Sequence, residues 1–257
     1  SNLAQVPVLA LQEVMGASAL TLCLPAQRRA AIICTSSSSF AGKPAGVCLD
    51  EVATPYYRLS EANVLVDLAS IAGGQVPIDA NSRSPSGADA RRFQADPVAM
   101  ESLRSTKALS TIASSLSTYD AIWLAGGAGA CADFADDKVL ITLIEKCFEI
   151  GKTVAAVGYG TIAFVNCMKP NGEPLVTNLQ VTGITNDEAK QAGMLELCER
   201  HAYLIESRFT AVGAKFVKGA PSAPETCRSH CLITAQNALA VQACARQVIA
   251  CLHGTVV

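Results

Sequence analysis

A glycine-rich turn holds the position at which this sequence could carry a nucleophile. Residues 157–161 read V-G-Y-G-T and join the apolar run TVAAV directly to the helical pattern IAFVN. A strand that enters a helix through one residue forms an elbow, and the elbow residue often has φ > 0. It stands over the helix N-terminus, where partial positive charge stabilises an anion. In an enzyme that residue is the nucleophile, and here it is Gly158.

A second glycine-rich turn, residues 125–130, follows another apolar run and reads A-G-G-A-G-A. Ligands of open parallel α/β sheets bind beyond the carboxyl ends of the strands. Both turns are therefore expected to border a binding site. We predict Gly127, Ala128, Gly129 and Gly160 as binding positions, with Cys131 just past the second turn.

The elements that must position these turns are alternating strands and helices. Near-continuous apolar runs, typical of strands covered on both faces, occupy residues 30–34, 64–70, 119–126, 153–158 and, more weakly, 230–235. Residues 138–150 and 241–252 carry apolar side chains at helical spacing, and Gly151 ends the first of these helices. This alternation predicts a mostly parallel sheet with right-handed crossovers.

Polar, turn-rich stretches separate these elements at residues 81–97, 169–174 and 219–226. None of them resembles a linker between two independent cores. We therefore predict one domain over residues 29–257, preceded by an N-terminal extension, residues 1–28.

The composition excludes several classes of protein. Of the 257 residues, 50% are apolar and 16% are charged, which excludes intrinsic disorder. A net charge of −2 provides no basic surface for phosphates, so we expect no nucleic-acid partner. No apolar stretch reaches the roughly 20 residues of a membrane span, and the leading segment lacks the basic residues of a secretory signal. We expect a cytoplasmic protein with no membrane partner.

The cysteines indicate a reducing compartment. There are eleven, an odd number, with no C-x-x-C motif, and most lie in apolar runs where a free thiol packs as a small hydrophobe. One cluster, Cys227, His230 and Cys231, has the residue types of a metal site. No fourth ligand follows at zinc-like spacing, so we predict neither a metal nor a cofactor.

Six segments carry a resemblance to a known family: residues 49–82, 119–137 (YDAIWLAGGAGACADFADD), 151–166 (GKTVAAVGYGTIAFVN), 181–189 (VTGITNDEA), 202–216 (AYLIESRFTAVGAKF) and 232–240 (LITAQNALA). In order and content the chain resembles the ThiJ/PfpI superfamily, which contains the Parkinson-disease-associated protein deglycase. The finer match is to its glyoxalase III-like, heat-shock-chaperone branch. The resemblance implies a flavodoxin-like three-layer α/β/α sandwich with a mostly parallel sheet, like class I glutamine amidotransferases, and a homodimer.

The family's chemistry implies a glutamate, an elbow cysteine and a histidine directly after it. The glutamate, four residues before the proline of an E-x-x-x-P motif, is present as Glu51. The elbow position is Gly158, the next is Tyr159, and a further family histidine falls on Ala128. Three departures at once indicate natural loss of the chemistry. Glycine keeps the turn without the roughly 1–3 kcal/mol of strain that a side chain costs there.

Each candidate residue also has a structural interpretation. Glu51 lies in an acidic pair at a predicted helix start, where it stabilises the helix dipole, and we favour that role or the orientation of a ligand. Tyr159 either donates to a ligand or packs as an aromatic side chain. Cys131 is our first choice for a substitute thiol, ahead of Cys34 and Cys48, although packing is the commoner role of a free cysteine.

Three functions remain open. We favour a catalytically degenerate family member, a binding, stress-response or chaperone-like module with a vestigial pocket for a small carbonyl or anionic ligand. The alternative is a glyoxalase III-like or deglycase-type enzyme that acts on small reactive aldehydes through Glu51, Tyr159 or Cys131. A dinucleotide-binding protein ranks third: both turns fit G-x-G-x-x-A, but neither is the first βα turn.

Overall fold

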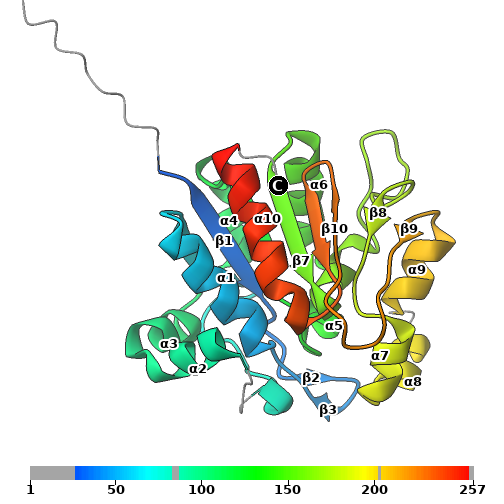
Figure 1. Ribbon diagram of the computed structural model, residues 1–257, viewed down its shortest axis with the longest axis horizontal. Helices are drawn as coiled ribbons and strands as arrows, with labels where there is room; N and C mark the ends of the chain where they lie inside the picture. Colours follow the sequence, from blue (N-terminus) through cyan, green and yellow to red (C-terminus); the bar gives the residue numbers. More distant parts are fainter. Residues whose placement is uncertain (1–26, 83–86, 202–203, 255–257) are drawn as a thin grey trace, which may run out of the picture.

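The apolar runs of the sequence form the centre of one sheet, with the strand order β10-β11-β7-β6-β1-β4-β5 (Figure 1). The computed structural model describes residues 27–82, 87–201 and 204–254. Within these residues the strands of the sheet are β1 (Arg29–Cys34), β4 (Leu65–Ser70), β5 (Lys107–Ala108), β6 (Ala121–Leu124), β7 (Thr153–Val157), β10 (Thr226–Ser229) and β11 (Leu232–Ala235).

The sheet is parallel except at one edge. β1 pairs in parallel with β4 on one side and with β6 on the other, and β7 lies between β6 and β11. β10 pairs antiparallel with β11. From β1 the chain runs outward to β4 and β5 and then returns to β6, so the strand order reverses between β1 and β6. The predicted mostly parallel α/β fold is confirmed; the two-residue strand β5 and the edge strand β10 were not predicted.

Helices cover both faces of this sheet. They are α1 (Leu49–Glu61), α2 (Ala88–Ala95), α3 (Pro97–Arg104), α4 (Leu109–Ser114), α5 (Ala130–Asp133), α6 (Lys138–Glu149), α7 (Asn186–Gln191), α8 (Leu195–Arg200), α9 (Ile205–Ala211) and α10 (Val241–His253). In Figure 1, α1 and α10 lie in front of the sheet, and α4 and α6 lie behind it. Each face has its own buried apolar cluster, so the sheet is the middle of three layers.

Short elements complete the described chain. Two small sheets are formed by β2 (Ser39–Phe40) with β3 (Lys43–Pro44), and by β8 (Gln180–Val181) with β9 (Lys215–Phe216). The 3₁₀ helices are η1 (Ala80–Ser82), η2 (Leu116–Thr118), η3 (Gly158–Phe164) and η4 (Ala238–Ala240). The segment after the elbow, for which we predicted a helix, is thus the 3₁₀ helix η3.

Helix α6 shows how closely local signals define an element. Asp137 caps it, because its side chain accepts a hydrogen bond from the Leu140 backbone N–H at 2.8 Å. The stripe that includes Leu143 and Ile144 is buried. Gly151, at φ +73°, follows the helix in the left-handed region that glycine adopts without strain. The prediction for residues 138–150 is confirmed to within one residue.

The prediction of a polar loop over residues 81–97 is wrong. This stretch contains α2, whose Ala90 and Phe93 are buried against the α1 face of the sheet. Asp96 then caps α3, accepting hydrogen bonds from the first backbone amides of that helix. The outer face of α2 is polar and exposed, so its stability comes from tertiary burial of a few side chains rather than from a local pattern. Of the predicted N-terminal extension, residues 1–26 lie outside the described part of the chain.

Candidate functional site

Three chain segments meet at the carboxyl ends of the central strands. They are the start of α1, the turn after β6 and the turn after β7. This end of the sheet lies at the bottom of Figure 1, next to the point where the strand order reverses. Open α/β sheets bind ligands at such reversals. The fold therefore brings the two predicted glycine-rich turns and Glu51 to the expected place.

Glu51 is held in position by its main chain. It lies in the first turn of α1, and Pro55 follows four residues later inside the helix. Proline has no N–H, so the helical hydrogen bond to the Glu51 carbonyl oxygen cannot form. The carbonyl instead accepts a hydrogen bond from the buried Trp123 Nε1–H of β6 at 2.9 Å. The E-x-x-x-P motif thus frees a carbonyl that attaches the start of α1 to the central sheet.

The carboxyl group of Glu51 is buried, with 4% of the residue exposed. Its Oε2 accepts a hydrogen bond from the Gly126 backbone N–H at 2.7 Å. Loss of hydration raises the pKa of Glu51 from 4.5 to about 7 and outweighs the Gly126 N–H and the neighbouring Cys48 thiol, which lower it. Near neutral pH the group is therefore divided between acid and carboxylate.

Gly158 faces this carboxyl group. It is the first residue of η3 and has φ +52°. A Cβ atom on residue 158 would stand 3.1 Å from Glu51 Oε1. A side chain at this position would therefore begin beside the acid, in the left-handed region that only glycine occupies without strain. The position opposite the acid carries no reactive atom in this protein.

The predicted binding glycines are packed against other protein atoms. A Cβ on Gly127 or Gly160 would stand 2.4 or 2.5 Å from a backbone carbonyl oxygen. A Cβ on Gly129 would stand 2.6 Å from the Thr35 methyl carbon. At these three positions glycine permits close approach of other protein atoms, which occupy the space that a side chain would fill. This arrangement gives no support to the dinucleotide-binding hypothesis.

Tyr159 and Ala128, the two histidine positions implied by the resemblance, belong to the core behind the sheet. Tyr159 is 9% exposed, and burial raises the pKa of its phenol. Within the described residues its hydroxyl has no hydrogen-bond partner. After burial, the thiols of Cys198 and Cys131 contribute most to the raised pKa of Tyr159.

The described cysteines differ in their relation to Glu51. Cys131 is 1% exposed, and the Cys198 thiol and burial raise its pKa. Cys34 is fully buried at the end of β1, and burial raises its pKa. Cys48 is partly buried and lies beside Glu51, whose backbone N–H donates to the Cys48 carbonyl oxygen at 3.1 Å. Of these three thiols, the one that affects the pKa of the acid is Cys48, which we ranked behind Cys131. Its place three residues before Glu51, across the first turn of a helix, was the available signal.

The cluster of Cys227, His230 and Cys231 lies away from this site. His230 and Cys231 form the two-residue turn between β10 and β11, with His230 at φ +55°. They border a hollow that also contains Thr153, the first residue of β7. Gly158 directly follows Val157, the last residue of that strand, so the two sites lie at opposite ends of β7. Within the described residues no group of His, Cys, Asp or Glu side chains is arranged to hold a metal.

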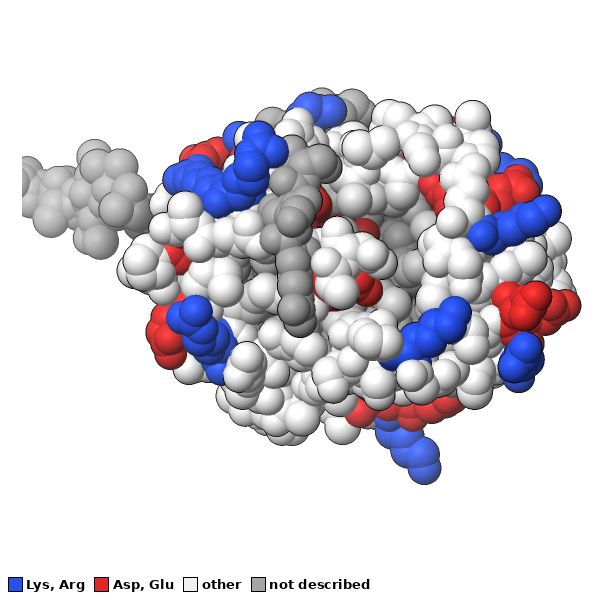
Figure 2. All heavy atoms as spheres, turned by 90° about the horizontal axis from the view of Figure 1, so that it is seen from below, with Lys and Arg blue, Asp and Glu red and all other residues white. Residues whose placement is uncertain are grey.

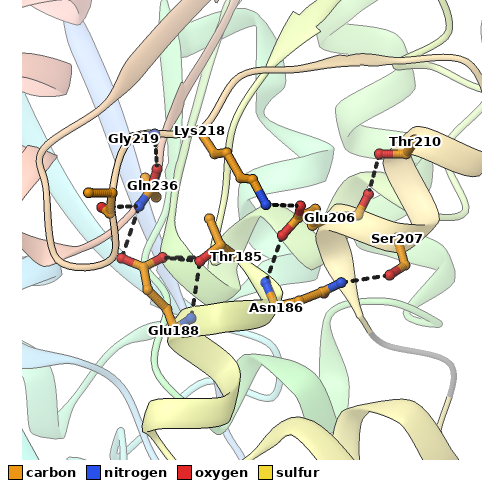
Figure 3. A network of polar contacts seen from close by, with 10 residues as sticks. Thr185, Asn186, Glu188, Glu206, Ser207, Thr210, Lys218, Gly219 and Gln236 are labelled. Atoms are coloured by element: carbon orange, nitrogen blue, oxygen red, sulfur yellow. Dashed lines mark hydrogen bonds and ion pairs between the residues drawn. The ribbon is translucent and has the colours of Figure 1, made fainter.

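A polar network that the sequence analysis missed anchors the segment beside the elbow (Figure 3). The Thr185 hydroxyl caps α7 by accepting from the Glu188 N–H, and the Glu188 side chain accepts in return from the Thr185 N–H at 3.1 Å. Glu206 of α9 accepts from the Asn186 N–H at 2.8 Å and pairs with Lys218 at 2.6 Å. The S/T-x-x-E spacing of Thr185 and Glu188 is the sequence signal that could have found this cap.

The surface over the site is mixed in charge. Figure 2 shows the molecule from the end where the strands finish, with Lys and Arg interspersed with Asp and Glu around the rim and mostly uncharged atoms between them.

None of the described helices is both long enough and apolar enough to span a bilayer.

Residues 45–250 match the DJ-1/PfpI family. Hsp3105 of Schizosaccharomyces pombe, whose name proposes it as a glutathione-independent glyoxalase, is 31% identical over 84 residues. That segment is 33% of this chain and 34% of the yeast protein, so the chain matches about a third of this relative.

Two solved structures share most of the fold. The Rapid Encystment Protein of 24 kDa from Francisella tularensis is 25% identical, with a TM-score of 0.80 over 86% of this chain and 97% of that chain. Glyoxalase III from Candida albicans is 24% identical, with a TM-score of 0.78 over 87% of this chain and 97% of that chain. Each of these two proteins therefore shares the fold described above over nearly its full length.

Proposed function

Because this chain belongs to the DJ-1/PfpI family and carries glycine at the elbow, we propose that it is a catalytically degenerate member without glyoxalase or deglycase activity. It acts as a binding or chaperone-like module whose ligand is a small carbonyl compound or an anion. The observation that carries this proposal is Gly158, at φ +52°, with Glu51 Oε1 3.1 Å from the place of its absent Cβ.

The chemistry of the site supports loss of activity. Addition of a thiolate to an aldehyde needs a sulfur beside the acid that protonates the developing oxyanion. Glu51, with its pKa raised to about 7, still has the property of such an acid. The sulfur is the missing part. A purified sample is expected to convert methylglyoxal no faster than buffer, and turnover that disappears in the E51Q variant would overturn the proposal.

Restoring the missing groups gives a second, positive test. The double variant G158C/Y159H is expected to gain a thiol at position 158 that reacts with iodoacetamide faster than any of the eleven native cysteines, because the protonated form of Glu51 donates a hydrogen bond to its thiolate. G254C is the matched control. Gly254 has a similar φ, +67°, and nothing within 4 Å of its Cβ position, so a thiol there has no neighbouring acid. Equal rates at positions 158 and 254, read by peptide mass spectrometry, would show that residue 158 is not the elbow.

A residual enzyme is the second candidate, and the place of Cys48 beside Glu51 favours it. Both glyoxalases among the relatives make small aldehydes the substrates to try. Burial and the negative charges of Glu51 and Asp50 raise the pKa of Cys48, however. The thiol therefore stays protonated and is a poor nucleophile. Alkylation mapping separates the two candidates: a hyper-reactive Cys48 supports the enzyme, and uniformly slow native thiols support the degenerate module.

A further inference from the structure

A groove lies between α4 and α6, the two helices behind the sheet in Figure 1. Its volume is about 430 Å³. Apolar side chains line it from both walls: Ala113 of α4, Leu116 of η2, and Val139 and Leu143 of α6. Val139 is 41% exposed, although it is a β-branched apolar residue. The α4–α6 groove is therefore apolar surface that another segment can bury.

The charged residues that line this groove are lysines. Lys138 and Lys146 border it about two helical turns apart on α6. The opposite wall, residues 109–118, contains no charged side chain. Lys146 forms an exposed ion pair with Glu149 at 2.7 Å, and none of the ion pairs among the described residues involves Lys138. The groove therefore fits a segment that is apolar and carries a negative charge.

A second copy of the chain does not fit this surface. In a twofold contact the same patch of each copy faces itself. The groove would then face a groove, and Lys138 and Lys146 would face the same lysines of the other copy, with no acidic residue in the lining to offset them. Apolar surface would stay uncovered, and the like charges would repel.

The chain itself contains a segment of the required chemistry. Residues 1–26, which lie outside the described part of the chain, have Leu, Val or Ala at 14 positions. Their single charged side chain is Glu13, and they contain no Lys or Arg. Residues 20–24 read L-T-L-C-L, a pattern that places three leucines on one side of an extended chain.

This segment joins the described chain beside the groove. The Asp120 N–H donates to the Arg29 carbonyl oxygen at 2.8 Å, and the Tyr119 N–H donates to the Leu116 carbonyl oxygen at 3.1 Å. The start of β1 is therefore about one helical turn from Leu116 in the groove wall. At full extension 26 residues span roughly 85 Å, and the twelve residues of α6 span roughly 18 Å, so the segment is long enough to follow the whole groove.

We propose that the apolar segment before β1, residues 3–24, packs into the α4–α6 groove of the same chain. Its leucines cover the apolar lining, and Glu13 faces Lys138 and Lys146. Burial of apolar surface drives the contact, and the opposite charges set its direction. None of these residues belongs to the candidate site at the elbow, so the contact is independent of the proposed function.

Photo-cross-linking of the full chain tests this contact. The photoreactive residue p-benzoylphenylalanine replaces Val139 in the groove, and in the matched control it replaces Val98 of α3, which is 73% exposed and outside the groove. After irradiation and digestion with trypsin, position 139 is expected to link to the peptide of residues 1–28, which ends at the first basic residue of the sequence. Position 98 should not form this link, and the linked protein should migrate as a single chain.

Charge reversal supplies a second measurement. E13K is expected to lower the yield of the link roughly two- to fivefold, because like charges then meet at the rim of the groove. Combining E13K with K138E and K146E should restore the yield. A link between two chains, equal yields from positions 139 and 98, or an E13K yield that is unchanged or is not restored would each overturn the proposal.

Discussion

The Glu51→Gln substitution tests the central electrostatic feature of the site. Burial raises the pKa of Glu51 from 4.5 to about 7, so the folded protein favours the protonated acid more than the unfolded chain does. The stabilising contribution of this group is complete below the unfolded value and is lost as pH rises through the folded value. Above pH 7 the folded protein holds a buried carboxylate that accepts a hydrogen bond from the Gly126 N–H but has lost its hydration, which costs free energy.

The difference between the two pKa values corresponds to roughly 3 kcal/mol. Glutamine keeps an oxygen that accepts from the Gly126 N–H and does not ionise. E51Q is therefore expected to match the wild type in stability near pH 4.5 and to exceed it by roughly 3 kcal/mol above pH 7. Urea unfolding followed by circular dichroism across this pH range measures the difference.

Glu188 provides the matched control because it is a buried carboxylate with the opposite shift. Its oxygens accept hydrogen bonds from Gln236 and Thr185 (Figure 3) and also from Asn237 and Ser222. These hydrogen bonds hold its pKa below the usual value despite burial. E188Q is expected to lose about 2 kcal/mol or more at pH 7, with the loss shrinking as pH falls through the low pKa. If the wild-type and E51Q stability curves run parallel from pH 4.5 to 8.5, our account of Glu51 is refuted.

Two further substitutions test how Glu51 is held. W123F removes the donor to the Glu51 carbonyl and leaves that buried oxygen unpaired, so it is expected to cost about 1–3 kcal/mol, and an unchanged urea midpoint would contradict the anchoring role. G158A places a Cβ at φ +52° beside Glu51 and is expected to cost more than the roughly 1–2 kcal/mol of the backbone conformation alone. G254A, with open space at φ +67°, should show only the backbone cost; equal losses in thermal unfolding would rule out the contact.

Five strands of the sheet, the α6 boundaries and the elbow could be predicted from the sequence because each depends on neighbouring residues. A strand covered on both faces needs a continuous apolar run, and the stripe and cap of α6 are contained in residues 137–149. The presence of glycine at position 158 is likewise a property of the chain alone. Only the resemblance to a family, and no local pattern, associated Glu51 with Gly158.

The contacts across the site were decided by the tertiary structure. Strand order and register place Trp123 of β6 against the start of α1, where Pro55 has freed the Glu51 carbonyl. They also bury Cys131 in the core and leave Cys48 beside Glu51, the reverse of our ranking. Local periodicity records which face of an element is buried. It does not record which distant element covers that face, because that depends on how strands order and helices pack throughout the folded chain.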